Sequence, residues 1–314
     1  MLKICIMYQK VYYQNKEKII NENLQRTELY KILFEMGRKK GIEFFFSTYG
    51  DFRGGLVRRA VIFDGMWKVV KNRKFDMVFD KTDTTYQKEK EMVSKKFFMI
   101  NNPSLSRILG DKYRFYKTFP QFSPKSFLVR NKKELAEIRK KIRTKKIVLK
   151  PTVGYGGKGV KITEKLPEKI RGETLVQEFI TPKENSEFGK VWDTRVIIIN
   201  GKIDHSYVRV AKKGSLLTNL HRGGTQIFID KKKIPLSVRR VVRCVDKKFE
   251  KFGPRFYCLD FIIDRNNKPW VIEGNARPSV VDYFEPERRK RFFKRLLRFF
   301  KTSYESCKDK PFIY

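Results

Sequence analysis

A glycine-rich loop between two predicted strands constrains the fold of this 314-residue chain more than any other feature. The segment Gly154–Gly159 has the spacing G-x-G-x-x-G, which in dinucleotide-binding folds opens a helix. Here Val160–Thr163 alternates as a strand does, so that interpretation is excluded. A P-loop is excluded because Lys158 is followed by glycine and not by Ser or Thr. What remains is a loop whose backbone N–H groups could fold over a polyphosphate.

Two neighbouring features support a nucleotide site without proving it. Lys150 ends the strand that enters the loop and would give bound phosphates a positive charge. Alone, it also fits a surface lysine beside an ordinary turn. The later strand Leu175–Ile180 could offer backbone groups to an adenine edge, with Phe179 or Ile180 against the ring. Alone, it is only an edge strand.

A pair of acidic residues near the end of the chain predicts a metal site. If Arg265–Lys268 form a four-residue hairpin loop, Asp260 lies directly opposite Glu273, and Asn275 points the same way. Adjacent carboxylates would repel unless a cation lay between them, and oxygen ligands favour Mg²⁺ or Mn²⁺. Solvated surface acids are the alternative. A register slip of one residue would also separate the pair.

Composition excludes several classes of protein. With 40% hydrophobic residues the chain is expected to be globular, and no apolar run approaches the roughly 18 residues of a membrane span. We therefore expect a cytoplasmic protein. Two histidines make a His-based zinc site or a Ser-His-Asp hydrolase difficult to assemble. The four cysteines are scattered and are interpreted as reduced packing residues.

The formal charge of +38 has two interpretations. It arises from 72 basic and 34 acidic residues spread over the whole chain, without a recognition helix, zinc finger or RNP-like motif. A solvated lysine-rich surface is one explanation. An acidic substrate or a polyanionic partner is the other.

Alternating strand and helix signals predict an α/β (α+β) chain with no internal repeat. We expect subdomains at residues 1–103, 104–188 and 189–285, followed by a basic tail at 286–314. In the tail, Pro286–Lys301 places five apolar residues on one helical face. Such a helix could bind a membrane surface or a partner, or it could pack its apolar stripe on the body of the protein.

The order of the short motifs carries a family resemblance over roughly residues 105–285. The motifs are Asp111-Lys112, Val148-Leu-Lys150-Pro with the glycine loop, Val176-Gln-Glu-Phe-Ile180, Asp193-Thr-Arg195, Arg209 to Gly214, Asn219-Leu-His-Arg-Gly-Gly224, Asp260-Phe and Glu273-Gly-Asn275. In this order they resemble the ATP-grasp superfamily, in particular its RimK-like glutamate ligase branch. The resemblance implies an ATP-grasp fold preceded by a Rossmann-like subdomain.

The resemblance also implies roles for individual residues. ATP would be held by Lys112, Lys150, Gly156 and Gly157 at the phosphates, by Gln177, Glu178, Phe179 and Ile180 at adenine, by Asp193 at the ribose and by Asn219 at the phosphate end. Two magnesium (or manganese) ions would bind Asp260, Glu273 and Asn275. Arg209 would stabilise an acyl phosphate, with Lys150 as the second catalytic residue, and Arg222 would bind a substrate carboxylate.

Two departures from the family pattern concern the substrate end of the site. Arg277 follows Glu273-Gly-Asn275 where relatives commonly have small residues, so it could change substrate preference. The simplest hairpin at Asn200-Gly201 would also turn Arg209 away from the face of Asp193. Either a bulge intervenes or the two residues serve different groups.

The expected function is ATP-dependent joining of a carboxylate to an amine, possibly the addition of glutamate to an acceptor that the sequence does not identify. A nucleic-acid-binding or scaffold protein that keeps the fold without turnover is the alternative. No side-chain nucleophile and no essential cysteine are expected.

Overall fold

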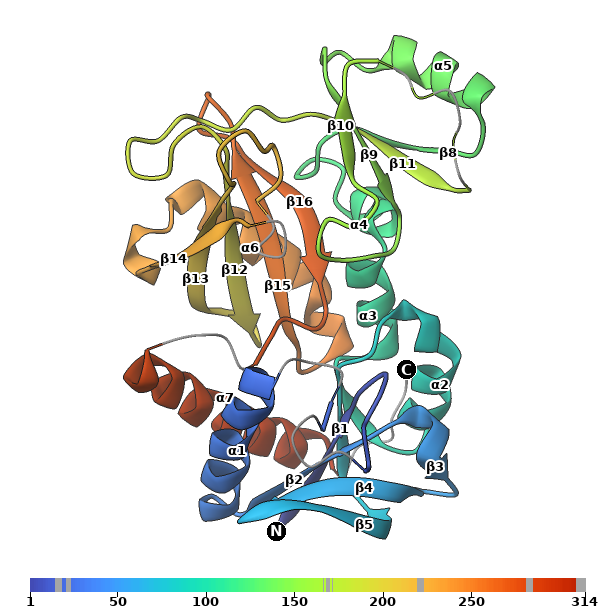
Figure 1. Ribbon diagram of the computed structural model, residues 1–314, viewed down its shortest axis with the longest axis vertical. Coiled ribbons are helices and arrows are strands. Elements are labelled where there is room, and N and C mark those ends of the chain that lie inside the picture. The colour runs from blue at the N-terminus through green and yellow to red at the C-terminus, as the bar shows by residue number, and fades with distance from the viewer. Residues whose placement is uncertain are drawn as a thin grey trace. The chain divides into compact units, whose positions relative to one another are not determined.

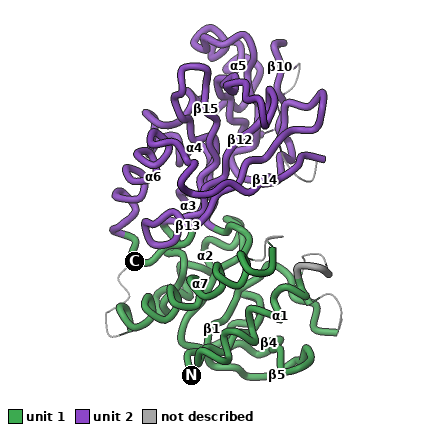
Figure 2. The backbone as a smooth tube through the Cα atoms, turned by 90° about the vertical axis from the view of Figure 1, so that its left-hand side faces the viewer, with its two compact units in different colours: residues 1–104, 252–256, 277–314 green, residues 105–251, 257–276 purple. Residues whose placement is uncertain are grey.

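The computed structural model describes residues 1–14, 19–20, 24–165, 167, 170, 172–218, 223–280 and 285–308. The chain forms two compact units, shown in Figure 2. Unit 1 comprises residues 1–104, 252–256 and 277–314, and unit 2 comprises residues 105–251 and 257–276. Both helices and sheets are present, as Figure 1 shows, so the predicted α/β class is confirmed.

Unit 1 is built on a sheet of seven described strands in the order β3-β4-β2-β1-β6-β7, with β5 paired to β4. The central strands β2, β1, β6 and β7 are parallel. The strands are β1 (Leu2–Met7), β2 (Ile42–Ser47), β3 (Phe52–Arg53), β4 (Leu56–Asp64), β5 (Met66–Lys74), β6 (Met77–Asp80) and β7 (Phe98–Ile100). β4 and β5 form an antiparallel hairpin around Gly65.

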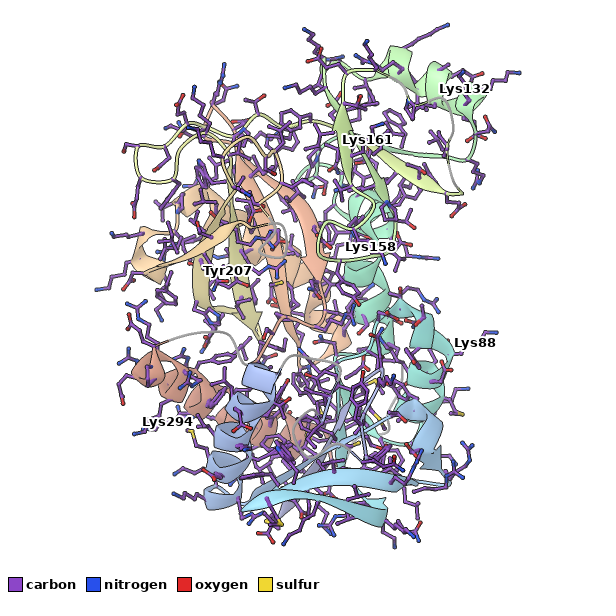
Figure 3. The ribbon with its side chains drawn as sticks, in the orientation of Figure 1. Lys88, Lys132, Lys158, Lys161, Tyr207 and Lys294 are labelled. Atoms are coloured by element: carbon purple, nitrogen blue, oxygen red, sulfur yellow. The ribbon has the colours of Figure 1, made fainter. Side chains whose placement is uncertain are left out.

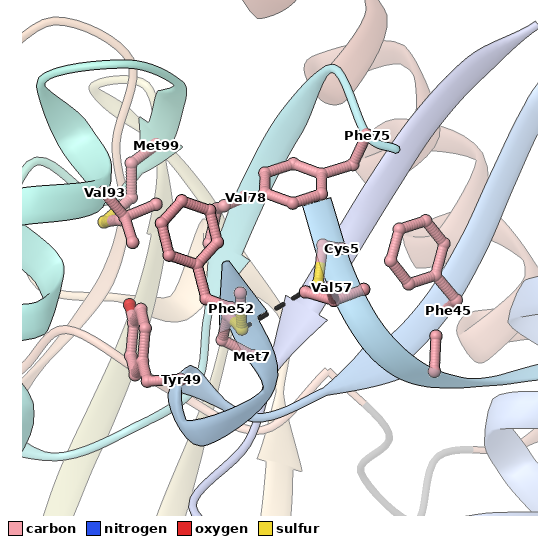
Figure 4. Packing of buried hydrophobic residues seen from close by; sticks show 11 residues of the cluster. Cys5, Met7, Phe45, Tyr49, Phe52, Val57, Phe75, Val78, Val93 and Met99 are labelled. Carbon is pink, nitrogen blue, oxygen red and sulfur yellow. Dashed lines mark hydrogen bonds between the residues drawn. The ribbon is translucent and has the colours of Figure 1, made fainter. Parts of the chain in front are cut away.

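The apolar runs of the central strands explain their position in the sheet. Parallel strands covered on both faces are nearly continuously apolar, and Ile4–Met7 of β1 is fully buried. Figure 4 shows part of this core, in which Cys5 and Met7 lie among Phe45, Phe52 and other side chains. The described part of the unit contains three α-helices: α1 (Leu24–Lys39), α2 (Gln87–Ser94) and α7 (Pro286–Cys307).

The tail helix α7 packs its apolar stripe within unit 1. Phe292, Phe293, Leu296, Leu297 and Phe300 are at most 3% exposed. The Phe300 ring lies 5.7 Å from the Phe44 ring of β2 and 5.0 Å from the Phe79 ring of β6, measured between centroids. Of the two predicted roles for the tail, the structure therefore supports packing on the body. No described helix is long and apolar enough to cross a membrane.

Unit 2 contains a four-stranded and a five-stranded sheet in its described part. The first has the order β10-β9-β11-β8, and the second has the order β14-β13-β12-β15-β16. Their strands are β8 (Ser126–Val129), β9 (Ile147–Pro151), β10 (Lys161–Thr163), β11 (Thr174–Glu178), β12 (Trp192–Ile199), β13 (Lys202–Val210), β14 (Thr225–Ile229), β15 (Phe256–Ile263) and β16 (Pro269–Asn275). The helices are α3 (Pro103–Gly110), α4 (Lys112–Thr118), α5 (Lys132–Lys141) and α6 (Leu236–Phe249).

Helix α5 covers the four-stranded sheet through an apolar position of its sequence. In α5, Leu135 is fully buried against Val129, Ile147 and Val176 of the four-stranded sheet. The helix begins after Asn131, whose side chain accepts a hydrogen bond from the Glu134 N–H and so satisfies a free donor of the first turn. These local signals fix the helix, and the helix packs against β8, β9 and β11 of the sheet, of which β9 leads into the glycine loop.

Candidate functional site

A cleft in unit 2 brings together residues of both its sheets. It encloses about 950 Å³ between protein atoms, including space open to solvent. Its lining includes the predicted residues Lys112, Lys150, Gly157, Gln177, Glu178, Phe179, Ile180, Asp193, Arg209 and Glu273. Residues that lie up to 161 positions apart in the sequence therefore face one space, as a small-molecule site requires.

Two lysines reach this cleft from different elements. The Lys150 Nζ, at the end of β9, donates to Gln177 Oε1 at 2.8 Å and to the Ile272 carbonyl at 3.1 Å. The Lys112 Nζ, at the start of α4, donates to the Gly154 carbonyl at 2.7 Å and lies 3.3 Å from Glu273 Oε1. Both ammonium groups are thus held in place by the protein at the cleft wall.

The glycine-rich loop connects β9 to β10, the strand-to-strand context that the sequence predicts. β9 and β10 pair antiparallel, with Leu149 opposite Lys161. Gly159 needs to be glycine, because its φ is +75° and an added Cβ would lie 3.2 Å from Pro151 Cδ. Figure 3 labels Lys158 in this loop, and its side chain also lines the cleft.

The end of β11 leaves backbone groups beside the cleft. Gln177 is held by its side chain, which accepts from Lys150 and donates to Ser126 Oγ at 2.8 Å. The Glu178 carboxylate accepts from the Arg143 N–H, and Phe179 donates its N–H to Thr144 Oγ1. Ile180 follows the strand and makes no hydrogen bond to another described residue through its N–H. A flat ring could therefore bind at this strand end through backbone groups.

The two predicted metal-binding acids, Asp260 and Glu273, lie opposite each other, but the hairpin that joins their strands differs from the predicted one. Ile263 pairs with Pro269, so the loop is one residue longer than the proposed Arg265–Lys268 loop, which was wrong. A register shift between Asp260 and Phe261 compensates, and Asp260 pairs with Glu273. The extra residue of the bulge is Ile272 on β16. Nearby on the same strand, Gly274 packs closely on α3, since a Cβ there would lie 2.7 Å from the side chain of Leu109.

A second bulge resolves the ambiguity over Arg209. Counting from the Asn200-Gly201 turn, strands β12 and β13 keep the register of the simplest hairpin as far as Ile198. The register then shifts between Ile197 and Ile198, and Asp193 pairs directly with Arg209. Of the two predicted alternatives, the bulge is the one the structure contains, and both side chains therefore lie on one face.

Beneath the cleft, two arginines and two carboxylates form a continuous network. Arg195 donates to both oxygens of Asp260, at 2.6 and 2.7 Å. Arg209 donates to Asp260 Oδ2 at 2.8 Å and to Asp193 Oδ1 at 2.7 Å. Thr218 donates its hydroxyl to the other oxygen of Asp193. Paired hydrogen bonds of this kind fix both the position and the orientation of a guanidinium group.

Burial and neighbouring charges shift the pKa values of these groups. Burial, with a smaller contribution from Lys112, lowers the pKa of Lys150 to about 8, although Glu273 and Asp260 act in the opposite direction. Burial tends to raise the pKa of Asp260, but Arg195 and Arg209 outweigh it and hold the pKa below the usual value. Burial raises the pKa of Cys258 to about 12, so its thiol stays protonated near neutral pH.

These contacts correct one premise of the metal prediction. Repulsion between Asp260 and Glu273 does not require a bound cation, because Arg195, Arg209 and Lys112 already compensate the two carboxylates. Among the described residues, no group of three or more His, Cys, Asp and Glu residues could hold a metal ion. The protein ligands would be two carboxylates and the Asn275 amide, leaving further positions to other oxygen donors.

The donor set nevertheless fits a hard divalent cation. Asp260 accepts three hydrogen bonds, whereas a carboxylate has about four acceptor positions, so one position on Oδ1 remains. Asn275 pairs with Cys258 two positions along the same strands, which places it on the same face as Glu273. Oxygen donors of this type suit magnesium or manganese.

Not every predicted residue is found in the cleft lining. Asp260 and Asn275 lie on β15 and β16 beside Glu273 without lining the cleft themselves. Asn219 and Arg222 fall outside the described residues. Gly156 belongs to the glycine loop without being part of the cleft lining. Arg277 belongs to unit 1, where its guanidinium donates to the Lys81 carbonyl at 3.4 Å.

Sequence reasoning assigned no role to Arg195, although a signal for it was present. Asp193 and Arg195 are two residues apart on one strand and therefore share a face. Since β12 lies next to β15, that face also contains Asp260. The alternation was visible in the sequence, but the adjacency of β12 and β15 was not.

Comparison with known proteins agrees with this geometry. The profile of the family described as "Prokaryotic glutathione synthetase, ATP-grasp domain" matches residues 112–268, which is half of the chain. A probable alpha-L-glutamate ligase of Cellvibrio japonicus is 34% identical over 166 residues, covering 50% of this chain and 51% of the relative. A glutathione synthetase of Brucella melitensis is 26% identical over 157 residues, covering 48% of each.

Solved structures resemble the whole chain at the level of the fold. D-alanyl-alanine synthetase A from Vibrio cholerae has a TM-score of 0.64 at 10% identity and covers 97% of this chain and 98% of its own. A RimK domain ATP-grasp protein from Sphaerobacter thermophilus has a TM-score of 0.60 at 12% identity, covering 95% and 98%. The curated relatives, in contrast, are matched over only about half of their length.

Proposed function

Because this chain belongs to the family of the prokaryotic glutathione synthetase ATP-grasp domain, we propose that it is an ATP-dependent carboxylate–amine ligase. The observation that carries the proposal is the meeting of Lys112, Lys150 and Glu273 at one cleft, with Asp260 directly opposite Glu273 on the neighbouring strand. Such an arrangement can hold a polyphosphate through cations while offering oxygen ligands to a metal ion beside it. Neither half would serve this purpose alone.

At the phosphate end, Lys112 and Lys150 would exchange their present acceptors for phosphate oxygens. Each already donates to neutral oxygens, at the Gly154 carbonyl and at Gln177, so the ammonium groups are oriented before a nucleotide binds. The N–H groups of the glycine loop, with Gly156 and Gly157, would cover the phosphates. We assign Asn219 to the same end on the family resemblance.

At the opposite end, adenine would bind against β11. Its edge would hydrogen-bond to backbone groups from Glu178 to Ile180, with Phe179 or Ile180 against the ring and Gln177 supporting the strand. The ribose would lie near Asp193. Because Asp193 is held by Arg209 and Thr218, a ribose hydroxyl could compete only for its remaining acceptor positions.

The proposed reaction transfers the γ-phosphoryl group of ATP to a carboxylate. The resulting acyl phosphate is attacked by an amine, and phosphate leaves as the amide forms. Arg209 would stabilise the negative charge of the acyl phosphate and of the tetrahedral adduct. Its fork is fixed on two carboxylates, so no reorientation would be needed during the reaction. Asp260, Glu273 and Asn275 would hold Mg²⁺ or Mn²⁺, and the ion would offset the negative charge of the phosphates.

The substrates are the least constrained part of the proposal. Several relatives are probable alpha-L-glutamate ligases, so we propose an acidic amino acid as one substrate. Arg222 would bind its carboxylate, and Arg277 would influence the choice of substrate. The acceptor would carry the second reacting group, on a small molecule or on a peptide.

The test is ATP hydrolysis to ADP and phosphate in the presence of Mg²⁺ and pooled amino acids or acidic peptides. We expect ADP with at least one pool, and a loss of at least about a hundredfold in Glu273→Gln because a metal ligand is removed. Glu187→Gln is the matched control, since it makes the same chemical change at an exposed residue of unit 2.

Two results would count against the ligase. Absence of ADP from every pool, combined with intact nucleotide binding, would favour a protein that keeps the fold without turnover. Equal ADP formation by the wild type and by Glu273→Gln would separate the activity from the proposed metal site. Product identification by mass spectrometry then establishes which amide is formed.

A further inference from the structure

The outward face of α7 carries a row of positive charges that the proposed ligase reaction does not use. Five exposed residues form this row, which we call the α7 basic stripe: Lys290, Arg291, Lys294, Arg298 and Lys301. Figure 3 labels Lys294 on this helix. None of the five makes an ion pair or a side-chain hydrogen bond with another described residue.

Helix geometry places the stripe on one side. At about 100° per residue, its five positions fall within an arc of about 100°, and they extend over about 16 Å of the helix axis. The buried residues Phe292, Phe293, Leu296, Leu297 and Phe300 occupy the opposite side. Because the apolar side is fixed in the core of unit 1, the cations are held in a row before any partner binds.

No acidic residue interrupts the row. The acids of the helix, Glu287 and Glu305, lie toward its two ends, and Glu305 pairs with Lys308 at 2.7 Å. The last residue of the stripe, Lys301, lies close to Gly41 of unit 1. A Cβ added to Gly41 would lie 3.7 Å from the Lys301 Nζ. Gly41 directly follows the exposed Lys39 and Lys40 at the end of α1, so two more cations adjoin the stripe.

Uncompensated cations in a row match a partner with regularly spaced negative charges. A nucleic acid has one at every phosphate, whereas a peptide would need an unusually acidic sequence. A lipid surface is also anionic, but peripheral helices bind it by inserting apolar side chains. Those of α7 are at most 6% exposed and are not available for insertion. Arginines at 291 and 298 further suit phosphate oxygens.

We propose that the α7 basic stripe is a sequence-independent binding surface for the phosphate backbone of a nucleic acid. This inference does not depend on the ligase reaction, because it uses only unit 1 residues outside the cleft. Each phosphate contact at the stripe displaces a bound counterion, so binding weakens as salt is added. With five contacts, the slope of log affinity against log salt is about −4.5 for a duplex.

The test compares two triple variants of the whole chain by fluorescence anisotropy. Labelled mixed-sequence 20-base-pair RNA and DNA duplexes are titrated separately at several salt concentrations. In the first variant, Lys290→Gln, Lys294→Gln and Arg298→Gln remove three charges from the stripe. The matched control removes three exposed charges from α6, through Arg240→Gln, Arg243→Gln and Lys247→Gln.

We expect the α7 variant to bind at least about tenfold more weakly at 0.1 M salt, with a slope smaller by about 2.7. The α6 variant should change affinity by no more than about threefold, because its three charges are not part of the stripe and make none of the proposed phosphate contacts. If the RNA duplex and the DNA duplex differ in affinity, the one that binds more tightly is the preferred ligand of the stripe.

Three outcomes would overturn the proposal. One is equal weakening in both variants, which would assign binding to total charge. Another is the absence of duplex binding at 50 mM salt. The third is stripe-dependent binding to vesicles containing 30% phosphatidylserine without duplex binding, which would indicate a lipid surface. Circular dichroism checks folding, and the single change Lys294→Glu provides a second variant if the triple variant unfolds.

Discussion

In unit 1, Asp80 and Lys90 form a 2.9 Å ion pair whose side chains are 3% and 2% exposed, whereas in unit 2 the buried charges reach the lining of a cleft. The Asp80 carboxylate also accepts from the Tyr49 and Thr82 hydroxyls, and Lys90 donates to the Thr82 carbonyl. Every contact of this pair is therefore made within unit 1, and no cleft residue is involved.

The charged groups in and beneath the cleft of unit 2 are not balanced in this way. The four cations are Lys112, Lys150, Arg195 and Arg209, and the three acids are Asp193, Asp260 and Glu273. One positive charge is therefore in excess. Five of these seven residues line the cleft. The comparison teaches that buried charge is structural where it is balanced and sealed, and that it is available for a ligand where it is unbalanced and faces open space.

The largest expected effect is on the sealed pair. Lys90→Met should lower the free energy of unfolding by about 3–5 kcal/mol, because it leaves the Asp80 carboxylate buried without its counterion. Urea denaturation followed by circular dichroism measures the change. The double variant Asp80→Asn, Lys90→Met should recover part of the loss, since no uncompensated charge remains. A loss below about 1 kcal/mol in the single variant would contradict the structural role assigned to the buried Asp80–Lys90 pair.

The next effect concerns the open network. Lys150→Met should weaken ADP binding about 10- to 100-fold, because hydrogen bonds to charged groups contribute about 1.5–3 kcal/mol. Isothermal titration calorimetry measures it. Lys161→Met is the matched control, as Lys161 is exposed on β10 and is not part of the cleft lining. Equal affinity in Lys150→Met and wild type would remove Lys150 from the nucleotide site.

A smaller effect follows from the pKa of Lys150, which burial lowers to about 8. The ammonium is present below that pH, so ADP affinity should be constant near pH 7 and should fall up to about tenfold per unit above pH 8. Folding responds in the opposite direction. Between about pH 8 and 10 the unfolded chain binds more protons at this site, so its contribution to stability rises with pH. Lys150→Met should remove both dependences.

The smallest effect is expected at an exposed ion pair. Arg130 and Glu173 lie 3.1 Å apart with side chains that are 61% and 55% exposed. Glu173→Gln should change the free energy of unfolding by less than about 1 kcal/mol, because water and salt screen the pair. A loss as large as that of Lys90→Met would mean that burial does not distinguish these pairs, and the comparison would need revision.

The sequence by itself determined the local elements and the types of chemical group. The glycine loop between strands followed from the alternation over Val160–Thr163. The apolar stripe of the tail was also visible, because a 3.6-residue period depends only on local order. The resemblance then added the family, which the profile match established.

Only the tertiary structure decided which of these groups meet. The bulges at Asp260/Phe261 and Ile197/Ile198 set which residues of β15–β16 and β12–β13 lie opposite each other, and a single-residue shift reverses the face of every following side chain. No local pattern determines such a shift, because the register depends on pairing and packing with residues of other segments of the chain. For the same reason, Arg195 became recognisable as a partner of Asp260 only once β12 and β15 were found side by side.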